Sequence, residues 1–153
     1  MRSVKFTKTD DSLTVGKIVC VGRNYAKHVA EMKGSVPKEP LLFFKPSTAL
    51  LGPNAPIRLP HFSSDIHHEV ELVILVGRDM QWVEAHRTLE YVGGYGVGLD
   101  LTARDRQGEA KERGEPWALA KGFYGSAPVS HFTPAADVGD PSDLSIQLLV
   151  NGD

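Results

Sequence analysis

Fifteen glycines and ten prolines are spread along the 153 residues and divide the chain into short segments. Both residue types interrupt helices, so their distribution favours short strands joined by turns over a helical bundle. We therefore predict a β-rich α+β fold. The predicted strands are 17–22, 41–46, 53–60 (a short edge strand), 66–77, 94–100, 127–132 and 144–150, and the predicted helices are 24–34 and 102–114. Thr102 and Asp105 would form a capping box at the start of the second helix.

Composition limits the classes of protein that need to be considered. The net charge of -2, without a basic run, argues against a nucleic-acid partner. No apolar stretch approaches the roughly 20 residues of a membrane span, and the N-terminus lacks the apolar run of a signal peptide. The single cysteine, Cys20, excludes an internal disulfide and fits the cytoplasm; its apolar neighbours predict a buried thiol, not a nucleophile. We expect one cytoplasmic catalytic domain over residues 1–153.

The last predicted strand, 144–150, is followed directly by Asn151-Gly152. This dipeptide is a strong signal for a two-residue hairpin turn, so a partner strand should come next. The sequence stops at Asp153 instead. We interpret the chain as the front part of a longer domain.

The strand at 66–77 carries the pattern H-x-E-x-E. Because side chains alternate across a strand, His67, Glu69 and Glu71 share one face, and Ile66 and His68 lie on the other. The two glutamates would stand roughly 7 Å apart at their bases, where two anions repel. A shared divalent cation removes that conflict, and hard oxygen ligands suit Mg²⁺ or Mn²⁺. The alternative is a solvent-facing stripe on a half-exposed sheet.

Asp100 ends a predicted strand in which Gly94, Gly96 and Gly98 occupy one face. Glycine at alternate positions weakens a strand unless something must approach its backbone closely. A ligand beside Asp100 would supply that reason, and glycines that serve sheet curvature are the alternative.

The helix after Asp100 places Arg104, Gln107 and Lys111 on neighbouring turns. Arg104 can grip a carboxylate, and Gln107 can donate to a carbonyl oxygen. Lys121, in the glycine-flanked segment AKGFYG, could reach a substrate oxygen from a loop. For both lysines a solvated surface position is the alternative.

On the first predicted helix, His28 and Glu31 are neighbours at i and i+3. A carboxylate beside an imidazole raises its basicity and orients it, as a base that activates water requires. Lys27 can also pair with Glu31, so a surface ion-pair helix is the competing interpretation.

Five segments together resemble the fumarylacetoacetate hydrolase family, most closely its acylpyruvate-hydrolase and oxaloacetate-decarboxylase-like members. The segments are KIVCVGRNYAKHVAEM, LFFKPSTAL, HHEVELVILVG, YVGGYGVGLDLTARDRQ and PWALAKGFYGSAPVS, in that order along the chain. The resemblance implies a mixed β-roll core in a homodimer, with Mg²⁺ or Mn²⁺ bound by an E-x-E pair and a later aspartate. The matching metal ligands are Glu69, Glu71 and Asp100.

The same matching assigns substrate contacts to Arg23, Arg104, Gln107 and Lys121, and the dyad of a helix that closes over the substrate to His28 and Glu31. The implied substrate is a small α-keto acid, which chelates the metal while Lys121 and Gln107 stabilise an enolate oxygen. The dyad would activate water for cleavage of a carbon–carbon bond in acylpyruvates. Decarboxylation of oxaloacetate would need only the metal and the enolate stabilisation.

Other functions remain open. Enol–keto isomerisation of hydroxy-diene-dioates in aromatic catabolism keeps the family but needs no activated water. A cupin-like metal barrel would need two histidines on one face, whereas adjacent His67 and His68 point oppositely. A fragment without activity is a further alternative, because family members normally continue into a glycine-rich Thr-Gly-Thr-Pro loop that is absent here.

Overall fold

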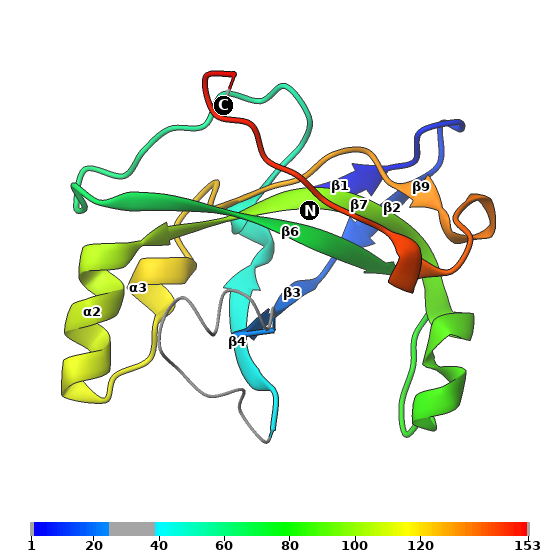
Figure 1. Ribbon diagram of the computed structural model, residues 1–153, viewed down its shortest axis with the longest axis horizontal. Helices are drawn as coiled ribbons and strands as arrows, with labels where there is room; N and C mark the ends of the chain where they lie inside the picture. The colour runs from blue at the N-terminus through cyan, green and yellow to red at the C-terminus, as the bar shows by residue number, and fades with distance from the viewer. Residues whose placement is uncertain (1, 25–38, 153) are drawn as a thin grey trace.

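The computed structural model describes residues 2–24 and 39–152 (Figure 1). Its strands are β1 (Arg2–Lys5), β2 (Ser12–Val15), β3 (Lys17–Gly22), β4 (Leu41–Pro46), β5 (Leu50–Leu51), β6 (Ile66–Val76), β7 (Val92–Ala103), β8 (Ala127–Pro128) and β9 (Thr133–Pro134). Its α-helices are α2 (Arg104–Arg113) and α3 (Ala118–Lys121), and short 3₁₀ helices cover Ser47–Ala49, Ala85–Tyr91, Ala135–Asp137 and Pro141–Asp143. The predicted strand-rich α+β class is confirmed. Within these residues, no helix has the length and apolar character needed to cross a membrane.

The long antiparallel hairpin of β6 and β7 runs across the whole molecule (Figure 1). β9 extends it to a three-stranded sheet, while β1 pairs with β2, β3 with β4, and β5 with β8 in separate two-stranded sheets of the described residues. α2 follows β7 without a loop and lies beside α3 at one end of the hairpin. The site residues on β6, β7, α2 and α3 are therefore held by one continuous unit.

The apolar core lies along one face of this hairpin. Val4, Leu50 and Phe132 are buried at its centre, and Val73 and Leu75 of β6 pack against them. Val73 and Leu75 share a face with Glu69 and Glu71, because these residues are separated by even numbers of positions. One face of β6 thus changes from carboxylates to core side chains along its length, and the candidate site adjoins the core.

The glycines of β7 make room for the chain itself and not for a ligand, which corrects our expectation. A Cβ on Gly94 would lie 2.6 Å from the carbonyl oxygen of Thr133, and a Cβ on Gly98 would lie 2.8 Å from Cγ2 of Val73. A Cβ on Gly96 would lie 3.2 Å from the ring of Phe132. The segment of residues 128–133 crosses this face of β7, and it fits there because these glycines have no side chains.

Several predicted elements differ from the structure. Strands β3 and β4 match the predicted bounds, β6 nearly does, and β7 is longer than predicted. No strand forms over 53–60 or 144–150. Pro53, Pro56 and Pro60 lack the N–H donors that a ladder needs, and residues 144–150 pair with no described strand. Asn151 and Gly152 do adopt the left-handed turn conformation, with φ of 57° and 95°.

The predicted capping box is also wrong. Thr102 is a fully buried residue of β7, and the N-cap of α2 is Ala103, without a side-chain cap. Asp105 instead accepts hydrogen bonds from the Ser63 hydroxyl at 2.6 Å and the Ser64 amide at 3.3 Å. Tertiary contacts take both polar side chains away from the local cap. The predicted helix at 24–34 lies largely outside the described residues.

Candidate active site

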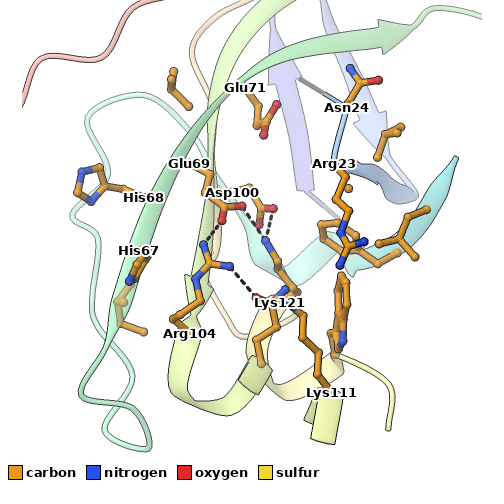
Figure 2. A pocket seen from close by; sticks show the side chains of 18 of the residues that line it. Arg23, Asn24, His67, His68, Glu69, Glu71, Asp100, Arg104, Lys111 and Lys121 are labelled. Atoms are coloured by element: carbon orange, nitrogen blue, oxygen red, sulfur yellow. Dashed lines mark hydrogen bonds and ion pairs between the residues drawn. The ribbon is translucent and has the colours of Figure 1, made fainter. Parts of the chain in front are cut away.

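The register of the β6–β7 hairpin places the acidic residues together. Glu69 lies directly opposite Asp100, and Glu71 lies opposite Gly98. Directly opposed residues of an antiparallel pair project from the same face. Figure 2 shows the carboxylates of Glu69, Glu71 and Asp100 on the pocket side of the hairpin, with His68 directed away from them. The pairing predicted from alternation along β6 is therefore extended across the sheet to Asp100.

Lys121 lies between two of these carboxylates. Its ammonium nitrogen is 2.9 Å from Oε2 of Glu69, 2.5 Å from Oδ2 of Asp100 and 2.6 Å from the Thr102 hydroxyl. Only 3% of the residue is exposed. Lys121 is the last residue of α3 and not part of a loop, which corrects the sequence prediction. A surface position for this lysine is excluded, and its charge stands within the acidic cluster.

Lys45 is a second buried cation that sequence reasoning missed. Its ammonium nitrogen lies 2.9 Å from Oδ1 of Asp100 and donates to the carbonyl oxygens of Leu101 and Lys121 and to the Ser126 hydroxyl. Burial lowers the pKa of Lys45, while the charge of Asp100 opposes that shift. Lysine is almost never fully buried without a partner. The sequence did hold a signal for this buried lysine, because Lys45 shares a strand face with the apolar Leu41 and Phe43.

Arg104 connects Glu69 to Gln107. Its guanidinium forms an ion pair with Glu69 and donates to the side-chain amide oxygen Oε1 of Gln107 at 2.6 Å. Gln107 is 3% exposed and lines the pocket. Since Arg104 occupies the carbonyl oxygen of this amide, the N–H groups of Gln107 remain the donors of its side chain. The predicted grouping of Arg104 and Gln107 on neighbouring turns of α2 is confirmed.

The surrounding charges determine the ionisation of Glu69. Burial by itself would raise its pKa, but the charges and hydrogen bonds of Lys121 and Arg104 outweigh burial. The pKa of Glu69 is therefore held below its ordinary value, and the carboxylate stays ionised at neutral pH. An ionised, half-buried glutamate is the form that a metal ion or a cationic group requires.

A cavity of about 910 Å³ is lined by Glu69, Glu71, Asp100, Arg104, Gln107 and Lys121. Phe43 and Trp117 form an aromatic part of its wall, and their ring centroids lie 5.9 Å apart. Lys121 stands over the Phe43 ring and Lys111 over the Trp117 ring, at 4.9 and 5.3 Å. Arg23, which the resemblance assigned to the substrate, also lines this cavity. His28 and Glu31 lie outside the described residues.

The family resemblance implies a divalent cation at these carboxylates. Oδ1 of Asp100 is buried and accepts no hydrogen bond of ordinary geometry from any described residue, although Lys45 contacts it as an ion pair. Three carboxylates on one face also form the hard-oxygen donor set that Mg²⁺ and Mn²⁺ prefer. In their present positions, however, no three acidic, histidine or cysteine side chains of the described chain converge as a metal cluster. The donor set fits, with the Lys121 ammonium between Glu69 and Asp100.

Comparison with known proteins assigns the chain to a family. Residues 17–153 match the family described as fumarylacetoacetate (FAA) hydrolase C-terminal. The chain belongs to the fumarylacetoacetate hydrolase family, as the sequence segments indicated.

The relatives include oxaloacetate tautomerases. The chain is 48% identical over 140 residues to oxaloacetate tautomerase YcgM of Escherichia coli, covering 91% of this chain and 64% of that protein. It is 49% identical over 136 residues to human mitochondrial oxaloacetate tautomerase FAHD1, covering 89% of this chain and 62% of that protein. The chain thus spans somewhat less than two thirds of these relatives.

A solved structure of the family resembles this one closely. Fumarylpyruvate hydrolase from Pseudomonas aeruginosa, in complex with Mn²⁺ and pyruvate, superposes with a TM-score of 0.83 at 36% identity. The match covers 92% of this chain and 62% of that chain. A homologue of this protein therefore binds a divalent metal together with a 2-oxo acid.

Proposed function

We propose that this chain carries the site of a divalent-metal-dependent oxaloacetate tautomerase, which interconverts the keto and enol forms of its substrate. The observation that supports this most is the buried ammonium of Lys121 within the Glu69–Asp100 carboxylate pair. A buried cation of this kind can stabilise negative charge that develops on a substrate oxygen beside it. The identity to oxaloacetate tautomerases supports the choice of substrate.

The chain's own residues would act by position and charge. Tautomerisation moves one proton from the methylene carbon to the keto oxygen, and no bond between heavy atoms breaks. Lys121 would exchange its hydrogen bond to Glu69 or Asp100 for one to the enolate oxygen, and the amide N–H groups of Gln107 would donate a second. Arg104 holds the Gln107 amide in this orientation through the 2.6 Å bond to its carbonyl oxygen. The buried Lys45 fixes both Asp100 and the backbone carbonyl of Lys121.

Glu69, Glu71 and Asp100 would hold Mg²⁺ or Mn²⁺. When bound, such an ion supplies Lewis acidity and a template for the two oxygens of a 2-oxo acid. The three carboxylates and the cations Lys45, Lys121 and Arg104 carry balanced charge. Because a divalent ion adds positive charge to this set, we expect metal and anionic substrate to favour each other's binding.

Cleavage of a carbon–carbon bond in acylpyruvates, the function expected from the sequence, is the second candidate function. The similarity to fumarylpyruvate hydrolase supports it. Hydrolysis also requires an activated water, for which the sequence offers His28 and Glu31 outside the described residues. We favour tautomerisation because it needs no activated water and because the similar proteins include oxaloacetate tautomerases. Homodimer formation and a cytoplasmic location stay predictions.

The experiment that tests the proposal follows the ultraviolet absorbance of enol-oxaloacetate as it converts to the keto form, with and without Mn²⁺. We expect Mn²⁺-dependent acceleration that Glu71→Gln abolishes. Acetylpyruvate, assayed in parallel, reports hydrolysis, and His28→Ala should slow its cleavage more than the tautomerisation of oxaloacetate. Unchanged Mn²⁺ affinity in Glu71→Gln, measured by titration calorimetry, would contradict the metal assignment. Rapid acetylpyruvate cleavage without oxaloacetate tautomerisation would favour the second function.

A further inference from the structure

The cationic residues of the cavity fall into two groups. Lys121 and Arg104 are paired with Glu69, and Lys121 is also paired with Asp100. Arg23 and Lys111 line the same cavity but have no acidic ion-pair partner among residues 2–24 and 39–152. Figure 2 shows Arg23 and Lys111 on one side of the pocket and Arg104 on the other. The inner cations are paired with carboxylates, whereas the outer two have no such partner within the described part of the chain.

Lys111 is held in place although its residue is exposed. Its ammonium lies 5.3 Å from the centre of the Trp117 ring, and Trp117 packs against Phe43 in turn. The pKa of Lys111 is lowered by partial burial and by the nearby positive charges of Arg104 and Arg23. A cation in a field of like charge gains from an anion, and a side chain already resting on a ring loses less freedom when it binds one.

Arg23 reaches the cavity from the end of β3. Its φ of 57° lies in the left-handed region, which is uncommon for a residue other than glycine. The planar guanidinium can bind a carboxylate through two parallel hydrogen bonds, which a lysine cannot do. Arg23, directly after β3, and Lys111, on α2, therefore bring two cations of complementary geometry to one wall of the pocket.

We propose that Arg23 and Lys111 form a second carboxylate site, which binds the distal carboxylate of a dicarboxylic 2-oxo acid. The inference rests on the proposed function, because the 2-oxo acid end of this substrate would occupy the inner site of Glu69, Glu71, Asp100 and Lys121. The two sites have different roles. The inner residues act on the reacting oxygens, whereas the outer pair selects substrates that carry a second negative charge.

Charge explains why a second site is needed. The protein has a net charge of -2, and acidic side chains line the inner part of the cavity. The overall charge repels a dianion, and the inner cations are already paired with carboxylates. Two cations without an acidic partner among the described residues attract the second carboxylate locally, and a polar contact that one substrate makes and another lacks is an effective basis for selection. Removing either cation should therefore weaken the binding of dicarboxylates and leave the binding of monocarboxylates unchanged.

The test compares two five-carbon 2-oxo acids, 2-oxoglutarate and 2-oxopentanoate, which differ by one terminal carboxylate. Neither is a β-keto acid, so neither loses carbon dioxide readily during the measurement. Binding to the chain is measured by titration calorimetry at a fixed Mn²⁺ concentration. Lys111→Met and Arg23→Met are compared with Arg113→Met, which removes a charge from α2 outside the cavity lining.

We expect the chain to bind 2-oxoglutarate more tightly than 2-oxopentanoate. Lys111→Met and Arg23→Met should each weaken the binding of 2-oxoglutarate by about tenfold or more, as loss of a charge-assisted hydrogen bond implies. Both variants should leave 2-oxopentanoate within about twofold, and Arg113→Met should leave both ligands unchanged. A preference that survives in both variants, or a loss that is equal for the two ligands, overturns the inference.

The inner site is tested separately in the same series. Mn²⁺-dependent binding of 2-oxopentanoate reports on the inner site, and Glu71→Gln should abolish it. If that binding is present but 2-oxoglutarate gains nothing, the second carboxylate site is wrong and the proposed function stands. If neither acid binds in the presence of Mn²⁺, the proposed function is wrong and the inference falls with it.

Discussion

The ammonium nitrogen of Lys45 lies 2.9 Å from Oδ1 of Asp100, although the two residues belong to different sheets. Lys45 is 2% exposed and Asp100 is 8% exposed. A buried ion pair is costly to form, but removal of one partner leaves an uncompensated buried charge. This contact therefore joins the β3–β4 hairpin to the acidic end of the β6–β7 hairpin.

Lys45→Met should lower the free energy of unfolding by about 3–5 kcal/mol, because Asp100 loses its cation and the acceptors of Leu101 and Ser126 lose their donor. Urea denaturation followed by circular dichroism measures the change. Lys17→Met, at an exposed position of the neighbouring strand β3, is the control and should stay within about 0.5 kcal/mol. Equal losses in the two variants would show that the buried contact adds nothing to the free energy of unfolding beyond an exposed lysine.

Lys121→Met should bind Mn²⁺ about tenfold more tightly in the absence of substrate. The Lys121 ammonium stands between Glu69 and Asp100, so its removal takes away a competing positive charge. The same variant should lose oxaloacetate tautomerisation, because the donor to the enolate oxygen is gone. Titration calorimetry and the absorbance assay measure the two effects, and weaker Mn²⁺ binding in this variant would count against the proposed geometry.

Gly94→Ala should destabilise the fold by about 1–3 kcal/mol, the usual cost of forcing an extra methyl into a packed interior. The new Cβ would meet the Thr133 carbonyl oxygen at 2.6 Å, and backbone cannot move aside as a side-chain end can. Gly108→Ala on α2 is the matched control, because nothing lies within 4 Å of its Cβ position. Thermal unfolding should show a gain of about 0.5–1 kcal/mol for this helical glycine. A neutral Gly94→Ala would refute close packing at β7.

Cys20 should react slowly with iodoacetamide. Burial, followed by the charge of Asp100, raises the pKa of its thiol from 9.0 to about 11. At pH 8 the thiolate fraction then falls by about 100-fold relative to an unshifted thiol, and the thiolate is the reactive form. The rate in the folded chain should rise about tenfold per pH unit up to pH 10.

The raised pKa of Cys20 also makes the stability of the fold depend on pH. A folded-state pKa above the unfolded value means that the Cys20 contribution is fully present below pH 9 and is lost as pH rises toward 11. Cys20→Ala should flatten this part of the stability curve. If Cys20 reacts as fast in the folded chain as in urea, its burial is wrong.

Sequence periodicity by itself determined the acidic face of β6 and the strands around it. A strand alternates its side chains, so the spacing of Glu69 and Glu71 fixes their shared face without any knowledge of the rest of the chain. The one-turn spacing of Arg104 and Gln107 on α2 was fixed in the same way. The family was also evident in the sequence, because its motifs occur in a fixed order.

Only the tertiary structure decided what surrounds those carboxylates. Lys45 and Lys121 are distant from Asp100 along the chain, and no local pattern relates a lysine to a carboxylate on another sheet. The reason for the β7 glycines was likewise decided by the segment packed against them, which periodicity does not reveal. The prediction of a strand at 144–150 was wrong for a related reason. An alternating pattern becomes a strand only where a partner strand takes up its backbone hydrogen bonds. Local spacing fixes the direction of a side chain, and long-range packing determines what it meets.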